Sequence, residues 1–210
     1  MPDSHTLRAD AELNRARVLD AAREVFAEFG LDVPLAEVAR RAGVGIATLY
    51  RRFPTADDLV DAVFASKMDE YANAAEEALD ADDPWKGFAG YVRHVCAMQA
   101  ADAGFADVLA LSPRPAFAEQ RSRAFRAFAK LVQRAKRDGT LRRDFVHQDL
   151  VILLMANAGV ARASLSNDAA LERFTEYMLQ AFRAPASAPL PQAPTPLETY
   201  RALEERSKVT

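Results

Sequence analysis

The amino-acid sequence predicts an all-α protein, on observations that hold along most of the chain. Apolar residues recur at intervals of three and four, as they do on the buried face of an amphipathic helix. No segment shows the alternation of apolar and polar residues that marks a half-buried strand, and no internal repeat is present. Helix stop and start signals such as Gly30, Pro84 and Gly139 separate the periodic segments, so we expect successive helices joined by short turns.

The first three helices are expected within the first 52 residues. The first runs from about Asp10 to Phe29, with Gly30 as a left-handed C-terminal cap. Two short helices follow, over residues 35–42 and 46–52, separated by Gly43-Val44-Gly45. Helices this short are not stable alone, so they must pack on their neighbours.

Longer helices are expected in the rest of the chain. Thr55-Ala-Asp-Asp58 is a capping box that begins a long helix, and Pro84 occupies the first position of the next one. Further helical segments are predicted over residues 105–111, 117–135, 150–161 and, capped by Asn167 or Asp168, to Phe182. Residues 184–196 are rich in Ala and Pro and predict a linker or tail, after which residues 197–208 can form a short charged helix.

Composition and charge limit the class of protein. Half of the 210 residues (50%) are hydrophobic and 27% are charged, which is typical of a globular chain with a sizeable core. The net charge of -3 gives no general attraction to phosphate, so any binding to nucleic acid must come from a local surface. The lone Cys96 cannot form an intramolecular disulfide, and residues 150–161 are too short to span a bilayer. We therefore expect a cytoplasmic protein with no membrane partner.

The segment from Leu35 to Phe53 contains the most informative motif. Ala39 is small where the two short helices cross, Gly43 can adopt the positive φ of the turn, and Leu49 anchors the second helix. Leu49 and Phe53 face inward four residues apart, which leaves an outer surface that can enter a major groove. That surface carries Ala47, Thr48, Arg51 and Arg52.

These residues belong to a wider pattern over roughly the first sixty positions. It consists of Val18-Leu-Asp-Ala-Ala22, Val25-Phe26, Phe29-Gly30, Val38-Ala39, Ala42-Gly43-Val44, Thr48-Leu49-Tyr50, Phe53-Pro54 and Leu59. The pattern resembles the signature of the TetR (tetracycline-repressor-like) family, and residues 135–144 more weakly resemble a turn of that family's effector domains. The resemblance implies a helix-turn-helix DNA-binding domain over residues 1–54, an effector-binding and dimerisation domain over 55–184, and a tail over 185–210.

The resemblance also implies contacts with double-stranded operator DNA. Tyr50 is expected at a backbone phosphate, Thr48 at a phosphate or base edge, and Arg51 and Arg52 at the groove and its rim. Arginine at either position could contact guanine through two hydrogen bonds. The chain departs from the family at Pro34, where Thr or Ser is frequent, at Gly45, where Ser is frequent, and at Ala56, where Lys is frequent. The full set of expected DNA contacts is Arg15, Arg17, Leu35, Gly45, Ile46, Ala47, Thr48, Tyr50, Arg51 and Arg52.

The second domain is expected to bind an unknown small molecule and to form a homodimer. Aromatic residues with a few polar groups are typical of ligand pockets, although most such residues serve as core. The candidates are Phe64, Met68, Tyr71, Phe88, Tyr91, Cys96, Gln99, Phe117, Phe125 and Asn157. The apolar helix over residues 150–161 requires cover on more than one side, which a second subunit can provide. The expected interface is Leu150, Leu153, Leu154, Ala158, Ala161, Phe174, Met178 and Phe182.

The sequence therefore predicts a transcriptional repressor that a small-molecule ligand releases from a palindromic operator. The alternatives are an activator or regulator without a small-molecule effector, and a helical dimerisation or scaffold protein. Enzyme activity has no support, because no Gly-rich phosphate loop, nucleophile elbow or paired acid and base is present. No cofactor or metal is expected. His94 and Cys96 lie two residues apart, and this spacing directs them to different helix faces.

Overall fold

The computed structural model describes residues 4–111, 114–163, 168–186, 188–195 and 197–199, and it confirms the all-α prediction. Within these residues the only extended pairing is an isolated bridge between Leu141 and Arg183. The α-helices are α1 (Ser4–Phe29), α2 (Leu35–Ala42), α3 (Ile46–Arg52), α4 (Ala56–Glu77), α5 (Pro84–Ala100), α6 (Ala103–Leu111), α7 (Ala118–Arg137), α8 (His147–Ala163) and α9 (Asp168–Phe182). Short 3₁₀ helices, η1 (Ala78–Asp80) and η2 (Pro115–Phe117), follow α4 and precede α7. None of the described helices is long and apolar enough to cross a membrane.

Local signals place the starts of α4 and α5 as predicted, whereas α8 extends beyond the predicted residues 150–161 at both ends. Thr55 and Asp58 form the capping box at the start of α4, with the Asp58 amide donating to Thr55 Oγ1 at 3.1 Å. Pro84 is the first residue of α5, and the Asp83 side chain accepts from the next two amides. The prediction for α1 was wrong at its start, since the helix begins at Ser4 rather than near Asp10. The apolar repeat that located α1 begins at Val18, so it contains no information about the first turns of the helix.

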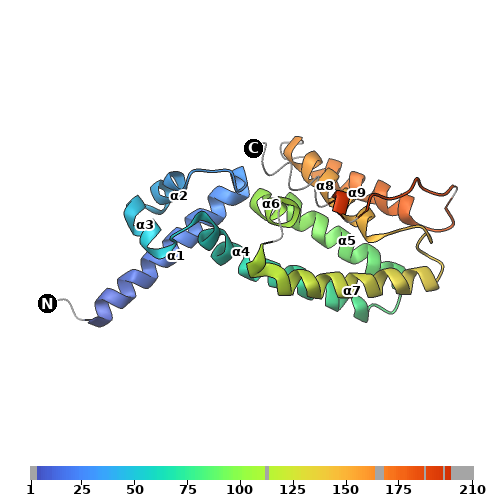
Figure 1. The fold of residues 1–210 in the computed structure, drawn as a ribbon, viewed down its shortest axis with the longest axis horizontal. Coiled ribbons are helices and arrows are strands. Elements are labelled where there is room, and N and C mark those ends of the chain that lie inside the picture. The colour runs from blue at the N-terminus through green and yellow to red at the C-terminus, as the bar shows by residue number, and fades with distance from the viewer. Residues whose placement is uncertain (1–3, 112–113, 164–167, 187, 196, 200–210) are drawn as a thin grey trace.

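The helices form a small N-terminal group and a larger bundle, joined by α4 (Figure 1). Helices α1 to α3 lie at one end of the molecule, and α4 runs from them into the bundle of α5 to α9. A first buried cluster, the N-terminal core, holds these helices together and extends to α6. It contains Val18, Leu19, Ala22, Val25, Phe26, Val38, Ala39, Leu49, Phe53, Leu59, Val60, Val63, Phe64, Met68, Met98, Phe105, Val108 and Phe117. A second cluster, the bundle core, includes Phe88, Tyr91, Val95, Phe128, Leu131, Leu150, Leu153, Leu179 and Phe182.

Gly104, near the start of α6, allows the bundle to approach α1 closely. A Cβ at this position would lie 2.7 Å from Phe64 Cζ and 2.9 Å from the backbone oxygen of Phe26. We expect Gly104→Ala to destabilise the protein by roughly 1–3 kcal/mol, because the backbone of α1 must shift to admit the methyl group. Urea unfolding measures the change.

Gly90 provides the matched control within α5, since a Cβ there would meet nothing within 4 Å. Gly90→Ala is expected to stabilise the protein by about 0.5–1 kcal/mol, through the lower backbone entropy of the unfolded chain. Equal unfolding free energies for the two variants would contradict the close approach of α6 to α1.

The start of the predicted tail is fixed to the bundle. Arg142, which is 7% exposed, forms an ion pair with Asp144 at 2.6 Å and donates to the carbonyl oxygen of Ala188 at 2.8 Å. The amide of Leu190 donates to the Asp144 carboxylate at 2.8 Å. The Arg142 guanidinium holds the pKa of Asp144 well below its usual range. Most of the short helix predicted over residues 197–208 lies outside the described residues.

Candidate functional site

Helix α3 exposes nearly all of its side chains. Only Leu49 is buried, with no exposed surface, and it anchors α3 in the N-terminal core. Ile46 and Tyr50 are 42% and 49% exposed, and Ala47, Arg51 and Arg52 are also exposed. Since these side chains contribute little to the core, the helix presents a surface that suits contact with another molecule.

Arg15 of α1 joins the exposed surface of α3. A hollow of about 210 Å³ lies between the two helices and is lined by Asn14, Arg15, Val18, Thr48, Arg51 and Arg52. Arg51 Nη2 donates to Thr48 Oγ1 at 3.0 Å, which orients the guanidinium along the helix. Among the described side chains, no carboxylate forms an ion pair with any of these three arginines, so their charges remain available to an anion. Arg17 is exposed on α1 but does not line the hollow.

The flanking residues contribute in other ways. Leu35 packs against the N-terminal core, so only its backbone amide, at the uncapped start of α2, can meet a phosphate. Gly45 precedes α3 in an extended conformation and provides no side-chain cap. Arg40 pairs with Glu37 at 2.6 Å and Arg41 with Glu28 at 3.2 Å, and these contacts reduce the contribution of both arginines to a cationic surface.

A largely enclosed cavity of about 130 Å³ lies in the bundle, among α4, α5, α6, α7 and α8. We call it the central cavity. It is lined by Tyr71, Gln99, Leu109, Arg121, Ala124, Phe125, Phe128, His147, Leu150, Val151, Leu154 and Met155. Tyr71, Gln99 and Phe125 are among the pocket residues expected from the sequence. Phe125 is 52% exposed, so it lies at the edge of the cavity rather than in the core.

The other expected pocket residues lie elsewhere, which corrects the sequence prediction. Phe64, Met68 and Phe117 are buried in the N-terminal core, and Phe88 lies in the bundle core with Tyr91. All are at helical spacing, and tertiary packing directs them to neighbouring helices rather than to the cavity. Cys96 and Asn157 line a separate groove of about 590 Å³ against α9, and burial raises the pKa of the Cys96 thiol to about 11.

Arg121 and His147 also line the central cavity, and neither was expected there from the sequence. Arg121 belongs to a run of basic residues on α7 that is typical of a solvated face, and nothing in the sequence shows that it turns inward. Burial lowers the pKa of His147, so its imidazole is neutral near pH 7. Its ring lies edge-on to Phe125, with centroids 4.7 Å apart.

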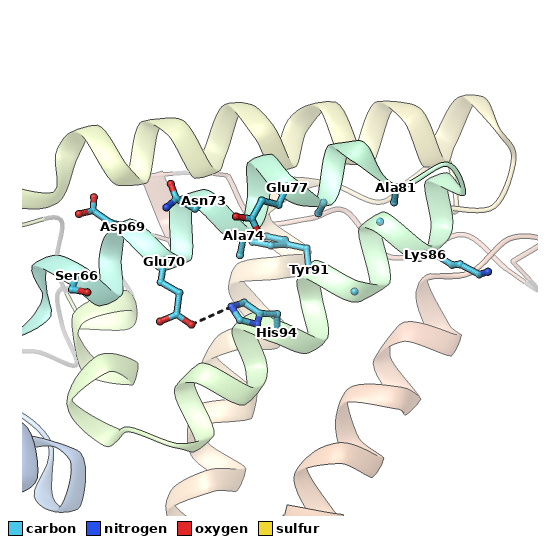
Figure 2. Close-up of a pocket in the computed structure, with 13 residues that line it drawn as sticks. Ser66, Asp69, Glu70, Asn73, Ala74, Glu77, Ala81, Lys86, Tyr91 and His94 are labelled. Carbon is cyan, nitrogen blue, oxygen red and sulfur yellow. Dashed lines mark ion pairs between the residues drawn. The ribbon is translucent and has the colours of Figure 1, made fainter.

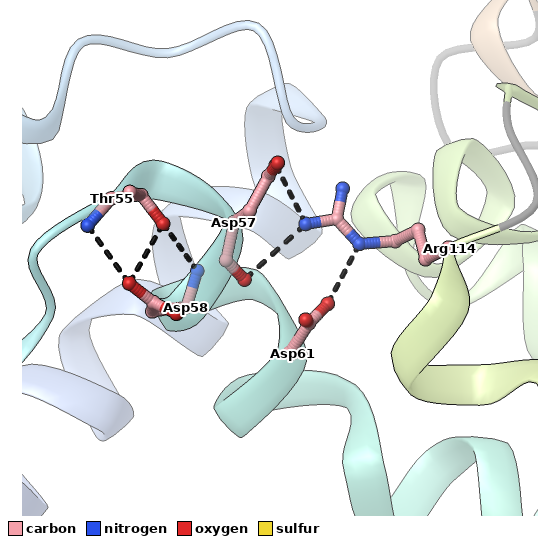
Figure 3. Close-up of polar contacts among 5 residues, drawn as sticks. All are labelled: Thr55, Asp57, Asp58, Asp61 and Arg114. Atoms are coloured by element: carbon pink, nitrogen blue, oxygen red, sulfur yellow. Dashed lines mark hydrogen bonds and ion pairs between the residues drawn. The ribbon is translucent and has the colours of Figure 1, made fainter.

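Polar contacts connect α4 and the segment after α1 to α6, α8 and the connection between α6 and α7. Arg114, between α6 and α7, pairs with Asp57 and Asp61 on the first turns of α4, at 2.8 Å each (Figure 3). Asp107 of α6 accepts the Leu31 amide at 3.0 Å and also binds Arg162 of α8. Burial raises the pKa of Asp107, and these two donors oppose the rise. The position of α4 and of the connection between α1 and α2 therefore depends on α6 and its flanking segments.

An open groove of about 760 Å³ runs between α4 and α5 (Figure 2). Asp69, Glu70 and Glu77 line it together with His94, whose Nε2 lies 3.7 Å from the Glu70 carboxylate. Glu70 and His94 are about half exposed, at 56% and 43%. These charges are well solvated, and the groove therefore has the character of an ordinary polar surface.

The residues expected at a subunit interface divide between the inside and the outside of the subunit. Leu150, Leu153, Ala158 and Phe182 are at most 6% exposed and are covered by their own chain, which corrects their assignment to the interface. Leu154, Ala161, Phe174 and Met178 are half-buried. The outer surface of α8 and α9 instead presents Ile152, Ala156, Gly159 and Tyr177, of which Ile152 and Tyr177 are 43% and 54% exposed.

Comparison with known families adds two matches. Residues 18–63 match the model of bacterial regulatory proteins of the tetR family. Residues 83–184 match the model of the C-terminal domain of SbtR-like transcriptional regulators. Together these segments cover the helix-turn-helix and most of the bundle.

Individual relatives extend the comparison. A crystal structure of a TetR transcriptional regulator from Streptomyces coelicolor is 31% identical with a TM-score of 0.52, over 82% of this chain and 99% of that one. The crystal structure of RolR in complex with resorcinol shares the fold, with 23% identity and a TM-score of 0.51 over 89% of this chain and 100% of that one. An uncharacterized HTH-type transcriptional regulator of Mycobacterium tuberculosis is 40% identical over 68 residues, which are 32% of this chain and 35% of that protein. The match thus spans about a third of the length of such curated relatives.

Proposed function

Because this chain belongs to the TetR family of bacterial regulatory proteins, we propose that it is a homodimeric repressor that a small-molecule effector releases from a palindromic operator. The exposed surface of α3 is the observation that carries the proposal. Arg15, Arg51 and Arg52 bring three cationic groups to one hollow, in a chain whose net charge is -3. A local surface of this kind provides the attraction to phosphate that the whole chain lacks.

Two contact classes are proposed for the DNA-binding surface. Arg51 and Arg52 contact base edges or phosphates in the major groove, and Tyr50 and Arg15 contact the phosphate backbone. Base contacts discriminate between sequences, whereas phosphate contacts set affinity for all sequences. Ile46 and Ala47 supply apolar surface that suits thymine methyl groups.

The dimer is proposed to form through α8 and α9. Ile152, Ala156 and Gly159 are exposed on α8, and small residues at this spacing permit close helix packing. Tyr177 adds an exposed aromatic side chain on α9. A two-fold axis would bring these surfaces together, and it would also pair two copies of α3 as a palindromic operator requires.

The central cavity is proposed as the effector site. Its lining residues Leu109 and Arg121 flank the connection between α6 and α7 that carries Arg114. Arg114 in turn contacts Asp57 and Asp61 at the start of α4, directly after the DNA-binding surface. A ligand that favours one position of this connection would shift α4, and with it the spacing of the two copies of α3.

Arg114→Met tests this coupling. The variant removes both ion pairs but leaves the cavity and α3 intact, so operator affinity without effector is expected to change little. In coupled systems an effector typically changes the affinity for the second ligand by a factor of about 5 to 150. For operator binding by Arg114→Met, this factor should fall towards one. Fluorescence anisotropy of labelled operator, with and without the effector, measures both values.

The control for Arg114→Met is Arg126→Met on the exposed side of α7, where Arg126 donates only to Ser122 among the described residues. It should respond to the effector as the wild type does. If Arg114→Met keeps the full response, the connection between α6 and α7 does not transmit the signal.

The direct test of the proposed function combines two measurements on the full chain. A gel shift with DNA flanking the protein's own gene tests operator binding, and a thermal-shift screen over metabolites and drugs identifies effectors. A hit must then weaken the DNA complex. Effector binding without release would favour an activator, and failure to bind any DNA would favour a dimerisation or scaffold protein.

A further inference from the structure

The size of the central cavity limits the effector to a small molecule. The cavity volume is about 130 Å³, well below the roughly 300–1,000 Å³ of pockets for drug-sized ligands. An apolar cavity of about 150 Å³ holds one benzene molecule. The volume is therefore close to that needed for a single ring, and it leaves no room for a second one.

The walls of the cavity favour an aromatic ring. The rings of Phe125 and Phe128 both lie edge-on to His147, with centroids 4.7 and 5.8 Å away, and Tyr71 lines the same cavity. Edge-to-face and offset arrangements stabilise aromatic pairs by more than the burial of their apolar area alone. Leu150 and Leu154 supply the remaining apolar surface.

One buried hydrogen-bond donor of a cavity residue has no acceptor among the described residues. Asn157 Nδ2 donates to the Cys96 carbonyl oxygen at 3.1 Å and to Gln99 Oε1 at 3.2 Å. The Cys96 carbonyl oxygen can only accept, so the Asn157 atom that faces it must be the nitrogen Nδ2. Because Nδ2 only donates, the Gln99 atom that faces it must in turn be the oxygen Oε1. Gln99 Nε2 is consequently buried with no partner among the described residues, while Gln99 lines the cavity and is 1% exposed. An unsatisfied buried donor of this kind is costly unless a ligand or water accepts from it.

The charge of the lining is positive. Arg121 lines the cavity and donates to the backbone carbonyls of Val108 and Leu109. No Asp or Glu is among the described residues that line the cavity. The wall thus combines a guanidinium with an amide donor, which suits an anionic oxygen ligand.

We propose that the central cavity binds a carboxylate carried on a single aromatic ring. The ring lies against Phe125, Phe128 and His147, and the carboxylate accepts from Gln99 Nε2 near the Arg121 guanidinium. This inference rests on the proposed function, since the ligand acts as an effector only if the protein is a ligand-released repressor.

The test is calorimetric titration of the purified full chain with four probes of similar size. Benzoate carries the ring and the charge, benzamide the ring without charge, benzylamine the ring with opposite charge, and hexanoate the charge without a ring. Benzoate is expected to bind at least tenfold more tightly than each of the others. Equal or tighter binding of any other probe, or no binding of benzoate, would overturn the assigned class.

Two variants test whether the ligand binds in the central cavity. Gln99→Met keeps the approximate side-chain volume but removes the donor, and it should weaken benzoate binding at least fivefold. Gln133→Met makes the same change at an exposed position of α7 and should leave binding unchanged. An unchanged benzoate affinity in Gln99→Met would show that benzoate binds elsewhere or that water satisfies the donor, and the inference would fail.

Operator binding of the same preparations, without any probe, separates this inference from the proposed function. If wild type binds operator but not benzoate, the ligand class is wrong and the repressor proposal stands. If benzoate binds as predicted but neither wild type nor Gln99→Met binds any operator, the cavity assignment stands and the proposed function fails.

Discussion

Replacing Arg51 and Arg52 by Ala is expected to abolish specific operator binding while the fold remains intact. Both side chains are exposed on α3, and the helix is anchored by Leu49 rather than by either arginine. A lost guanine contact costs roughly 1–3 kcal/mol. Because a dimer presents each side chain twice, the double variant should lose several kcal/mol, which is at least a hundredfold in affinity at about 1.4 kcal/mol per tenfold.

Single variants separate base contacts from phosphate contacts. Loss of a base contact lowers affinity for operator but not for unrelated DNA, whereas loss of a phosphate contact lowers both and reduces the salt dependence of binding. Anisotropy titrations at several salt concentrations measure these effects. Arg40→Ala is the control, since Arg40 pairs with Glu37 and should affect affinity much less. If both Arg51→Ala and Arg52→Ala bind operator like wild type, α3 is not the recognition helix.

The second large effect is expected at the proposed dimer surface. Gly159→Asp places a carboxylate on the exposed side of α8, where a Cβ would meet nothing within 4 Å of its own subunit. The charge would be buried without a partner in the dimer, a situation that costs roughly 3–5 kcal/mol. The variant should therefore be a folded monomer at concentrations where wild type is dimeric, as measured by analytical ultracentrifugation and circular dichroism.

Ala158→Asp is the matched control, because it introduces the same charge one residue earlier, at a position that is 6% exposed within the subunit. This variant is expected to unfold the subunit rather than only to separate the dimer. Ile152→Asp should behave like Gly159→Asp, since Ile152 is 43% exposed. Dimers of wild-type affinity in both surface variants would rule out an interface on this part of α8.

The helix-turn-helix could be predicted from the sequence because its determinants are local. The spacing of Leu49 and Phe53, the positive φ of Gly43 (66°) and the capping box at Thr55 are encoded within a few residues of one another. The same holds for Pro84 at the start of α5. Such features depend little on the rest of the chain, and the structure reproduces the predicted bounds of α2 and α3.

The cavity and the interface could be predicted only in part, because both depend on tertiary packing. Helix α8 is apolar on nearly all sides, so periodicity cannot tell Leu153, which is fully buried, from its exposed neighbour Ile152. In α4, Phe64 and Tyr71 lie on one apolar stripe, yet only Tyr71 reaches the central cavity. Arg121 lines the cavity although its surroundings in the sequence are basic and polar. In each case the neighbouring helix decides the role of the residue.

Hydroxyl-radical footprinting on an operator selected from random-sequence DNA tests the central proposal most directly. Two copies of α3 related by a two-fold axis should protect two inverted half-sites, separated by one helical turn of about 34–36 Å or a multiple of it. The double variant, in which Arg51 and Arg52 are both replaced by Ala, should lose the protection of both half-sites together. Protection of a single asymmetric site, or equal protection of unrelated DNA at the same salt concentration, would contradict a dimeric repressor that reads a palindromic operator.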